Sequence, residues 1–346
     1  MSFILDRMNI RQGPYRIDEP KKRTTLFSKK LFLVVVIAIV GLVGLAGFRN
    51  NDNEVTKVAS VAVESENEVD NDAKELARLE LQKRIEASPL SRLELPTTGQ
   101  SAIGTLELGT ILTSTDDQQV PIASITKLIT SLAILDKEPL QLGEQGRELL
   151  LTAQDEKYYW DYVALQGTIT PVTAGFSMTT YEALQAMLLA SSNNMSDTIV
   201  DNYFASKQDY LDYANEYLKR QGLDNTQVAD TTGFSADSKS TPSDLIKLAQ
   251  LALNNPVIKQ IVAQPEATIS VAGEIPNYNP IINDPNVIGL KPGATDEAGY
   301  TLLFAADLPN SNGGIETFIG VALGFQDRAE YVQTAKNMVE AARQAL

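Results

Sequence analysis

The stretch Ser124–Leu135, SITKLITSLAIL, decides both the fold and the chemistry of this 346-residue chain. It places Lys127 three residues after Ser124, where the chain enters an apolar segment with the character of a buried helix. Side chains three residues apart lie on the same face of a helix, so these two groups are within reach of each other. We therefore predict that the Lys127 amine activates the Ser124 hydroxyl as a nucleophile.

The absence of two residue types excludes several kinds of catalytic and metal site. It contains no histidine and no cysteine, which excludes a Ser-His-Asp triad, a Cys-His pair and a His-ligated zinc. The alternative interpretation of the Ser-x-x-Lys motif is an ordinary helix N-terminus, because a chain of this length contains about one such motif by chance. The motif therefore needs support from the rest of the sequence.

Charge is distributed very unevenly along the chain. Residues 1–30 carry eight Lys/Arg and three Asp/Glu, a net charge of +5, so the remainder must carry −20 to give the total of −15. Leu31–Phe48 (LFLVVVIAIVGLVGLAGF) follows without a single polar side chain and nearly spans a bilayer of about 30 Å. Because basic flanks stay in the cytoplasm, we expect a single-pass anchor in the cell membrane with residues after 48 exported.

The apolar run Leu31–Phe48 has two alternative interpretations, a buried core helix and a cleaved signal peptide. A buried core helix normally keeps a polar face, which this run lacks. A cleaved signal peptide would use the small residues at Gly44–Gly47, but the basic lead is long for that, so we favour an uncleaved anchor. Without cysteine, the exported part must rely on its apolar core, and its acidity argues against nucleic acid as a partner.

The remainder divides into a stalk and a globular region. Residues 49–95 are predicted to form an acidic stalk with a helix over Asp72–Ala87. Residues 96–346 are predicted to form one catalytic domain. The expected strands are Ser101–Leu106, Thr110–Thr113, Ala267–Val271, Val287–Lys291, Tyr300–Ala306 and Thr317–Leu323. The expected helices are Ile125–Leu135, Ala183–Leu189, Met195–Phe204, Lys207–Gln221, Pro242–Leu253 and Arg328–Leu346. This order predicts an α+β fold whose sheet is built from both ends of the domain, with a helical insertion.

Two more polar elements follow Ser124 and Lys127 in the sequence. Ser191 and Asn193 come just past the end of an apolar helix, where Ser191 can relay a proton and the Asn193 amide can orient Lys127 and a substrate. Lys291-Pro292-Gly293 is expected to end a strand, with Lys291 as a second cation and Gly293 leaving room for a substrate against the backbone. Each element alone is more typical of a loop or a turn, and the ordered set of three is far more specific.

With these three elements, the chain resembles the D-alanyl-D-alanine carboxypeptidases, the low-molecular-weight penicillin-binding proteins related to serine β-lactamases. The resemblance covers roughly residues 98–346. It is carried by PIASITKLIT around Ser124, MLLASSNN around Ser191 and GLKPGATDEAGY around Lys291, with DTTGFS and STPSDLIKLAQ between them. It implies a serine β-lactamase/transpeptidase-like fold with an antiparallel sheet, flanking helices and a helical subdomain, here preceded by one transmembrane helix.

The resemblance also implies roles for individual residues. Ser124 would be the acylated nucleophile and Lys127 its base, with Ser191 and Asn193 as proton relay and substrate contact. The strand residues Lys291 and Gly293 would bind substrate. Backbone N–H groups of Ser124 and Ala294 would form the oxyanion hole, and Arg328 would lie near the terminal carboxylate of the substrate.

One residue departs from the family pattern. Pro292 stands where relatives carry a threonine or serine, so it offers neither a hydroxyl nor an N–H. Carboxylate binding must then depend on Lys291, Arg328 or a nearby hydroxyl such as that of Thr295. The deacylation element of class A β-lactamases, Glu-x-x-Leu-Asn, is not visible, so we do not expect efficient β-lactam hydrolysis.

The resulting hypothesis is a membrane-anchored serine D-Ala-D-Ala carboxypeptidase acting on peptidoglycan stem peptides, with β-lactams as covalent inhibitors. It needs no metal or organic cofactor. The alternatives are a transpeptidase or an endopeptidase of the same fold, or a non-catalytic peptidoglycan-binding scaffold.

Overall fold

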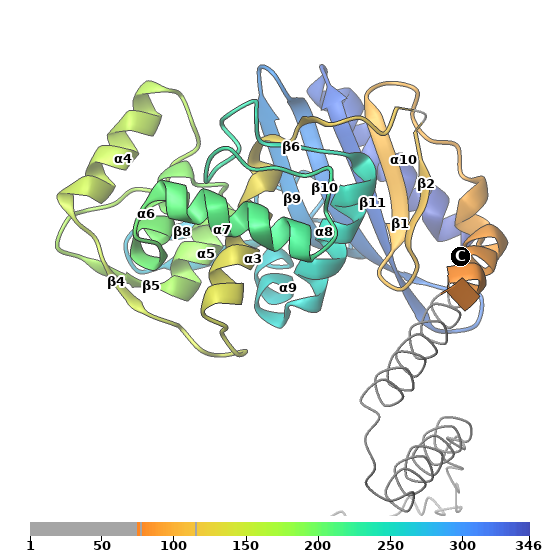
Figure 1. Cartoon of the computed structure of the whole chain (residues 1–346), viewed down its shortest axis with the longest axis horizontal. Helices are drawn as coiled ribbons and strands as arrows, with labels where there is room; N and C mark the ends of the chain where they lie inside the picture. Colours follow the sequence, from red (N-terminus) through yellow and green to blue (C-terminus); the bar gives the residue numbers. More distant parts are fainter. Residues whose placement is uncertain (1–74, 77, 115) are drawn as a thin grey trace, which may run out of the picture. The chain divides into compact units, whose positions relative to one another are not determined.

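A five-stranded antiparallel sheet forms the centre of the computed structural model, which describes residues 75–76, 78–114 and 116–346. Its strands lie in the order β2-β1-β11-β10-β9 (Figure 1). They are β1 Gln100–Thr105, β2 Gly109–Thr113, β9 Val287–Thr295, β10 Gly299–Pro309 and β11 Ile315–Phe325. Ser101 in β1 lies opposite Ala322 in β11, which confirms an α+β fold with a sheet made from both ends of the domain.

Helices cover both faces of this sheet. Along β11, Ile319 and Val321 belong to one apolar core together with residues of α8 (Pro242–Asn254). Phe318 and Ala322 belong to a second core together with residues of α10 (Arg328–Ala345). Because successive side chains of a strand point to opposite faces, these two cores lie on opposite sides of the sheet.

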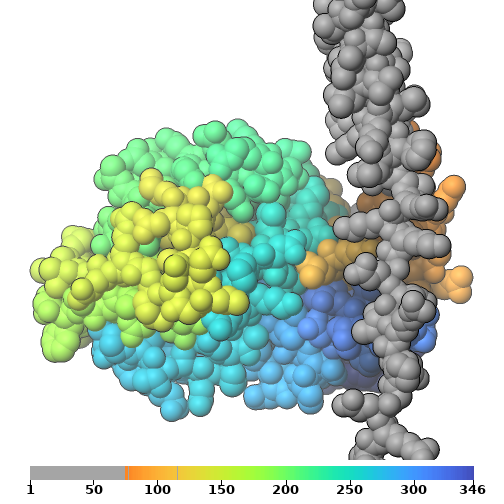
Figure 2. All heavy atoms as spheres, turned by 90° about the horizontal axis from the view of Figure 1, so that it is seen from below, coloured from red at the N-terminus to blue at the C-terminus, as the bar shows by residue number. Residues whose placement is uncertain are grey.

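The remaining helices gather beside the edge strand β9. They are α3 Thr126–Lys137, α4 Ala153–Ala164, α5 Thr180–Leu188, α6 Asn193–Tyr203, α7 Lys207–Arg220 and α9 Pro256–Val262. Helices α3 to α7, in yellow and green, and α9, in cyan, lie together beside the blue C-terminal strands (Figures 1 and 2). A 3-10 turn, η2 (Ala123–Ile125), leads into α3 and contacts both β9 and β10. The start of α3 is thereby held against the edge of the sheet.

Short elements complete the described part of the chain. They are η1 Pro89–Arg92 and the strand pairs β3 Val120–Pro121 with β6 Lys239–Ser240, β4 Glu148–Leu150 with β5 Ser177–Thr179, and β7 Glu266–Ile269 with β8 Gly273–Pro276. The strand predicted over Ala267–Val271 therefore exists as β7, but it pairs with β8 in a hairpin apart from the central sheet.

Two sequence-based expectations need correction. The helix α4 was missed because it has no continuous apolar face: its one buried residue is Asp155, which forms a capping box with Thr152. Strand β9 does not end at Lys291 but continues to Thr295. An edge strand tolerates the proline at 292, because the side without a partner does not require an N–H.

The predicted cytoplasmic tail 1–30, the predicted anchor Leu31–Phe48 and most of the predicted stalk lie outside the described residues. Of the helix predicted over Asp72–Ala87, residues 75–76 and 78–87 are described and are helical. Within the described part of the chain, no helix combines the length and the hydropathy needed to cross a membrane.

Candidate active site

The predicted site residues meet at one cavity of about 400 Å³ between the helical region and the edge of the sheet. It is lined by seven of them: Ser124, Ser191, Asn193, Gly293, Ala294, Thr295 and Arg328. Lys127 and Lys291 are both fully buried. The structure thus brings together residues that are as far apart as 124 and 328 in the sequence.

Ser124 reaches this cavity from a strained piece of backbone. Ala123, the residue before it, has a φ of 45°, in the left-handed region that residues with a Cβ rarely occupy. Gly233 lies so close that a Cβ there would come 1.8 Å from the Ala123 carbonyl oxygen. Strain of this kind persists only where the surrounding structure imposes it, and it concentrates at functional sites.

Lys127 is held directly behind Ser124. Its Nζ lies 2.8 Å from the Ser124 Oγ, 2.7 Å from the Asn193 Oδ1 and 2.9 Å from the Thr232 carbonyl oxygen. Burial lowers the pKa of the Lys127 ammonium to about 7, although the carboxylates of Asp230 and Asp197 act in the opposite direction. A large neutral fraction is therefore available near neutral pH.

The three contacts of Lys127 suit the neutral amine. A neutral amine has two N–H groups and one lone pair. The carbonyl oxygens of Asn193 and Thr232 can only accept, so they take the two N–H groups. The lone pair then faces the Ser124 hydroxyl, which can donate to it. This is the arrangement that a general base needs before it removes a proton.

Ser191 and Asn193 lie where α6 begins. Ser191 has a φ of 58°, which is a second left-handed residue at the cavity. The Thr168 hydroxyl donates to the Ser191 carbonyl oxygen at 2.5 Å, and the Asn193 N–H donates to the Thr168 carbonyl oxygen at 2.8 Å. Among the described residues, none forms a hydrogen bond with the Ser191 hydroxyl, which leaves it available to a ligand.

The opposite wall of the cavity is the open edge of β9. Lys291, Pro292, Gly293 and Ala294 pair in regular register with residues of β10. Because proline has no N–H, the nitrogen of Pro292 must face away from β10. Strand groups repeat every two residues, so the N–H of Ala294 faces the same open side, toward the cavity.

The two walls lie close together at Gly293. A Cβ at this position would come 2.7 Å from the backbone nitrogen of Ser124, so a larger residue would push the walls apart. The N–H groups of Ser124 and Ala294 therefore lie on neighbouring backbones, where a pair of donors can meet a carbonyl oxygen.

Lys291 differs from Lys127 in its contacts. Its one hydrogen bond within the described part of the chain is a long one, 3.4 Å from Nζ to the carbonyl oxygen of Pro292. Burial, and then the neighbouring Lys127, lower the pKa of Lys291 well below its ordinary value. A ligand carboxylate beside Lys291 would favour its protonated, cationic form.

Thr295 and Arg328 line the outer part of the cavity. The Thr295 Oγ1 accepts a hydrogen bond from the Ala298 N–H at 3.1 Å, so its own hydrogen is free to donate. Arg328 is the first residue of α10, after the cap Asp327. Both provide donors on the side of β9 where a substrate carboxylate would need them.

Several functional groups were missed from the sequence. The most important is the Thr232 carbonyl, which binds Lys127, because a backbone contact leaves no mark in residue type. The cavity is also lined by side chains not singled out earlier: Gln166, Thr168, Phe234, Tyr278, Tyr300 and Tyr331. The stretch DTTGFS at 230–235 was the available signal for Thr232 and Phe234, since it stood out as family-like.

Comparisons with known proteins agree with this geometry. Residues 98–313 match the model of the D-alanyl-D-alanine carboxypeptidase family. A D-alanyl-D-alanine endopeptidase of Pseudomonas aeruginosa is 30% identical over 243 residues, which cover 66% of this chain and 74% of that protein. A D-alanyl-D-alanine carboxypeptidase of Streptomyces sp. (strain K15) is 28% identical over 232 residues, covering 62% and 76%.

Solved structures show the same fold. The Streptomyces K15 DD-transpeptidase has a TM-score of 0.64 at 21% identity, covering 72% of this chain and 99% of that one. The D-alanyl-D-alanine carboxypeptidase from Mycobacterium tuberculosis has a TM-score of 0.63 at 21% identity, covering 75% and 96%. From the matched residues and the geometry of the cavity, this chain belongs to the D-alanyl-D-alanine carboxypeptidase family of serine-type peptidases.

Proposed function

We propose that this protein is a serine D-Ala-D-Ala carboxypeptidase that removes the terminal D-alanine of peptidoglycan stem peptides. The observation that carries the proposal is the 2.8 Å contact between the Ser124 Oγ and the Nζ of the fully buried Lys127. A hydroxyl paired with an amine whose pKa is about 7 is an activated nucleophile at neutral pH.

The reaction has two halves. Lys127 takes the hydroxyl proton as Ser124 Oγ attacks the carbonyl carbon between the two D-alanines. The N–H groups of Ser124 and Ala294 stabilise the oxyanion. The Ser191 hydroxyl, at the same cavity, relays the proton to the departing amine of D-alanine. Water then attacks the ester on Ser124. Lys127 takes a proton from this water and returns it to the Ser124 Oγ as the shortened peptide leaves.

Recognition of the terminal carboxylate falls to the β9 side of the cavity. Lys291 and Arg328 supply positive charge and Thr295 supplies a hydroxyl. Pro292 contributes no hydrogen-bond donor. β-Lactams carry a carboxylate beside a reactive amide, so we expect them to acylate Ser124 as well.

The chemical test uses a fluorescent penicillin and residues 50–346. We expect the wild-type protein to be labelled and Ser124→Ala to lose at least about 99% of the label, because within the described residues no other hydroxyl forms a hydrogen bond with the Lys127 Nζ. Ser311→Ala is the control, because it removes the hydroxyl of an exposed serine between β10 and β11 and leaves the cavity intact. Labelling that persists in Ser124→Ala would contradict the assignment of the nucleophile.

An endopeptidase is the second candidate, favoured by the similarity to the Pseudomonas aeruginosa D-alanyl-D-alanine endopeptidase. Incubation with a defined pentapeptide and with a cross-linked dimer separates the two activities. Release of free D-alanine supports the carboxypeptidase, whereas conversion of the dimer to monomers supports the endopeptidase. A third product, a new cross-link to an added amine acceptor, would indicate a transpeptidase. If none of these products forms, the alternative of a non-catalytic scaffold gains support.

For its location we propose that Leu31–Phe48 anchors the chain in the cell membrane, with residues 1–30 in the cytoplasm and the catalytic domain outside. The support is the apolar run with its basic N-terminal flank. Protease added to intact spheroplasts should digest the catalytic domain and spare an N-terminal tag. Protection of both parts would contradict this topology.

A further inference from the structure

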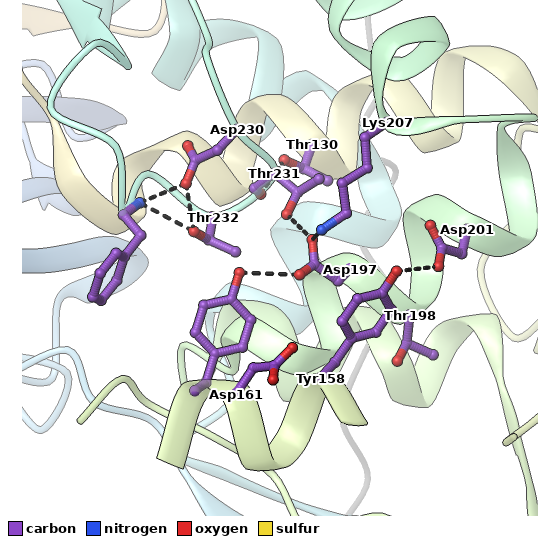
Figure 3. A network of polar contacts seen from close by, with 12 residues as sticks. Thr130, Tyr158, Asp161, Asp197, Thr198, Asp201, Lys207, Asp230, Thr231 and Thr232 are labelled. Carbon is purple, nitrogen blue, oxygen red and sulfur yellow. Dashed lines mark hydrogen bonds and ion pairs between the residues drawn. The ribbon is translucent and has the colours of Figure 1, made fainter. Parts of the chain in front are cut away.

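Asp197 is a buried carboxylate that the reaction described above does not use. It lies on α6 one helical turn after Asn193, and its side chain is 3% exposed. Its oxygens accept hydrogen bonds from the Thr231 hydroxyl at 2.6 Å and from the Tyr162 hydroxyl at 3.0 Å. The Lys207 Nζ forms an ion pair with it at 2.9 Å (Figure 3). A charge this deeply buried is costly unless it is paired in this way.

The hydrogen bond with Thr231 connects Asp197 to the segment that contacts the catalytic base, Lys127. The next residue, Thr232, offers the carbonyl oxygen that lies 2.9 Å from the Lys127 Nζ. The backbone of this segment is also held from α3, because the Thr130 hydroxyl donates to the Thr231 carbonyl oxygen at 2.8 Å. Asp197 thus fixes the side chain of Thr231, and Thr130 fixes its backbone.

Other charged and titratable groups surround Lys127 on every side. Asp230 lies in the same segment as Thr231, and its carboxylate accepts the N–H groups of Gly233 and Phe234 at 2.8 Å. Lys291 faces Lys127 from β9. The phenols of Tyr162 on α4 and Tyr210 on α7 are protonated, since burial raises the pKa of both. Asp197 therefore belongs to a small set of charges around the base.

We propose that Asp197 is a positioning residue that holds the Thr232 carbonyl against Lys127 and supplies a negative charge favouring the protonated amine, with Lys207 as its exposed counter-charge. The inference rests on the proposed function, because it concerns the base of that reaction. The two effects of Asp197 act in different ways. Its hydrogen bond to Thr231 affects the rate at high pH, and its charge affects the pH at which the rate falls.

The sign of the charge effect can be worked out. Lys127 acts as a base only when neutral, so the acylation rate rises with pH and levels off above a pKa of about 7. Asp197→Asn removes a negative charge, lowers the pKa of Lys127 and moves this rise to lower pH. Lys207→Gln leaves Asp197 uncompensated, raises the pKa of Lys127 and moves the rise to higher pH.

The experiment measures acylation by a fluorescent penicillin against pH for full-length wild-type protein and both variants. One pH unit below the midpoint, we expect Asp197→Asn to retain a several-fold larger fraction of its plateau rate than wild type, and Lys207→Gln a several-fold smaller one. Asp201→Asn is the matched control, since Asp201 lies one turn further along α6, is exposed and accepts from Tyr158. It should leave the midpoint in place.

A second pair of variants tests the hydrogen bond. Thr231→Val should lower the plateau rate several-fold, and Thr231→Ser should restore it, because serine keeps the donor to Asp197. A midpoint that stays in place in both Asp197→Asn and Lys207→Gln, in folded proteins judged by melting temperature, would overturn this inference and leave the proposed function intact. A wild-type protein that reacts at no pH would overturn the proposed function, and this inference with it.

Discussion

The helical wall of the cavity differs from the strand wall in where its buried lysine finds partners. Lys127, on the helical side, has three hydrogen-bonding partners from its own chain within 2.9 Å. Within the described residues, the Nζ of Lys291, on the strand side, has one hydrogen bond, of 3.4 Å. Both lysines are fully buried, yet only the first is satisfied without a ligand. We therefore assign the chemical step to the helical wall, which is formed by the starts of α3 and α6, and anion binding to the strand wall, which is formed by β9.

The largest effect on the acylation rate should come from removing the base on the helical wall. Lys127→Met removes the base and should slow acylation by at least about a thousandfold, because the Ser124 hydroxyl loses its proton acceptor. Stopped-flow labelling with a fluorescent penicillin measures the rate. Lys137→Met, an exposed lysine on the same helix α3, is the control. Equal rates in the two variants would mean that the walls do not differ in chemistry.

A smaller effect on the acylation rate should follow from removing Lys291 on the strand wall, and it should be accompanied by a change in stability. Lys291→Met removes the cation for the substrate carboxylate and should slow acylation roughly 10- to 100-fold through weaker binding. It also removes a buried amine whose pKa the fold lowers well below its ordinary value, and a lysine pKa that falls on folding costs stability. We expect a gain of about 1 kcal/mol in stability, or about 2–4 °C in melting temperature.

Calorimetry of Lys291→Met beside Lys336→Met, an exposed lysine on α10, checks the second half of that prediction. A lower melting temperature for Lys291→Met would show that Lys291 is stabilised by its surroundings. The contrast between the two walls would then fail, because both lysines would be satisfied within the protein.

The smallest effect on the acylation rate should come from adding a hydrogen-bond donor to the strand wall. Pro292→Thr supplies a hydroxyl at the open edge of β9, and we expect acylation by penicillin to become about tenfold faster, in line with the lower end of the range for one hydrogen bond to a charged group. The methyl ester of the same penicillin has no carboxylate and serves as the control substrate. An equal gain with acid and ester would contradict a role for this position in carboxylate recognition.

The two walls also differed in how well they could be predicted from the sequence. On the helical wall, the contact between Ser124 and Lys127 was predicted because helical spacing fixes which side chains meet. Asn193 was predicted from its place in the ordered set of three elements. The end of β9 was placed wrongly at Lys291, because proline usually interrupts strands and only the sheet order shows that this strand lies at an edge. The contacts of Thr232 and Asp197 depend on how the segment 230–235 packs against α3 and α6, which no local pattern reveals.

The pairing of β1 with β11 has a consequence for how the chain is made. When a ribosome has synthesised β1, the strand that must lie beside it, with Ser101 opposite Ala322, is still more than two hundred residues from being translated. Contacts between such distant segments form slowly. The nascent chain must therefore wait with one unpaired edge of β1 until translation is nearly complete. Premature termination before Ile315 would leave β1 paired with β2 alone.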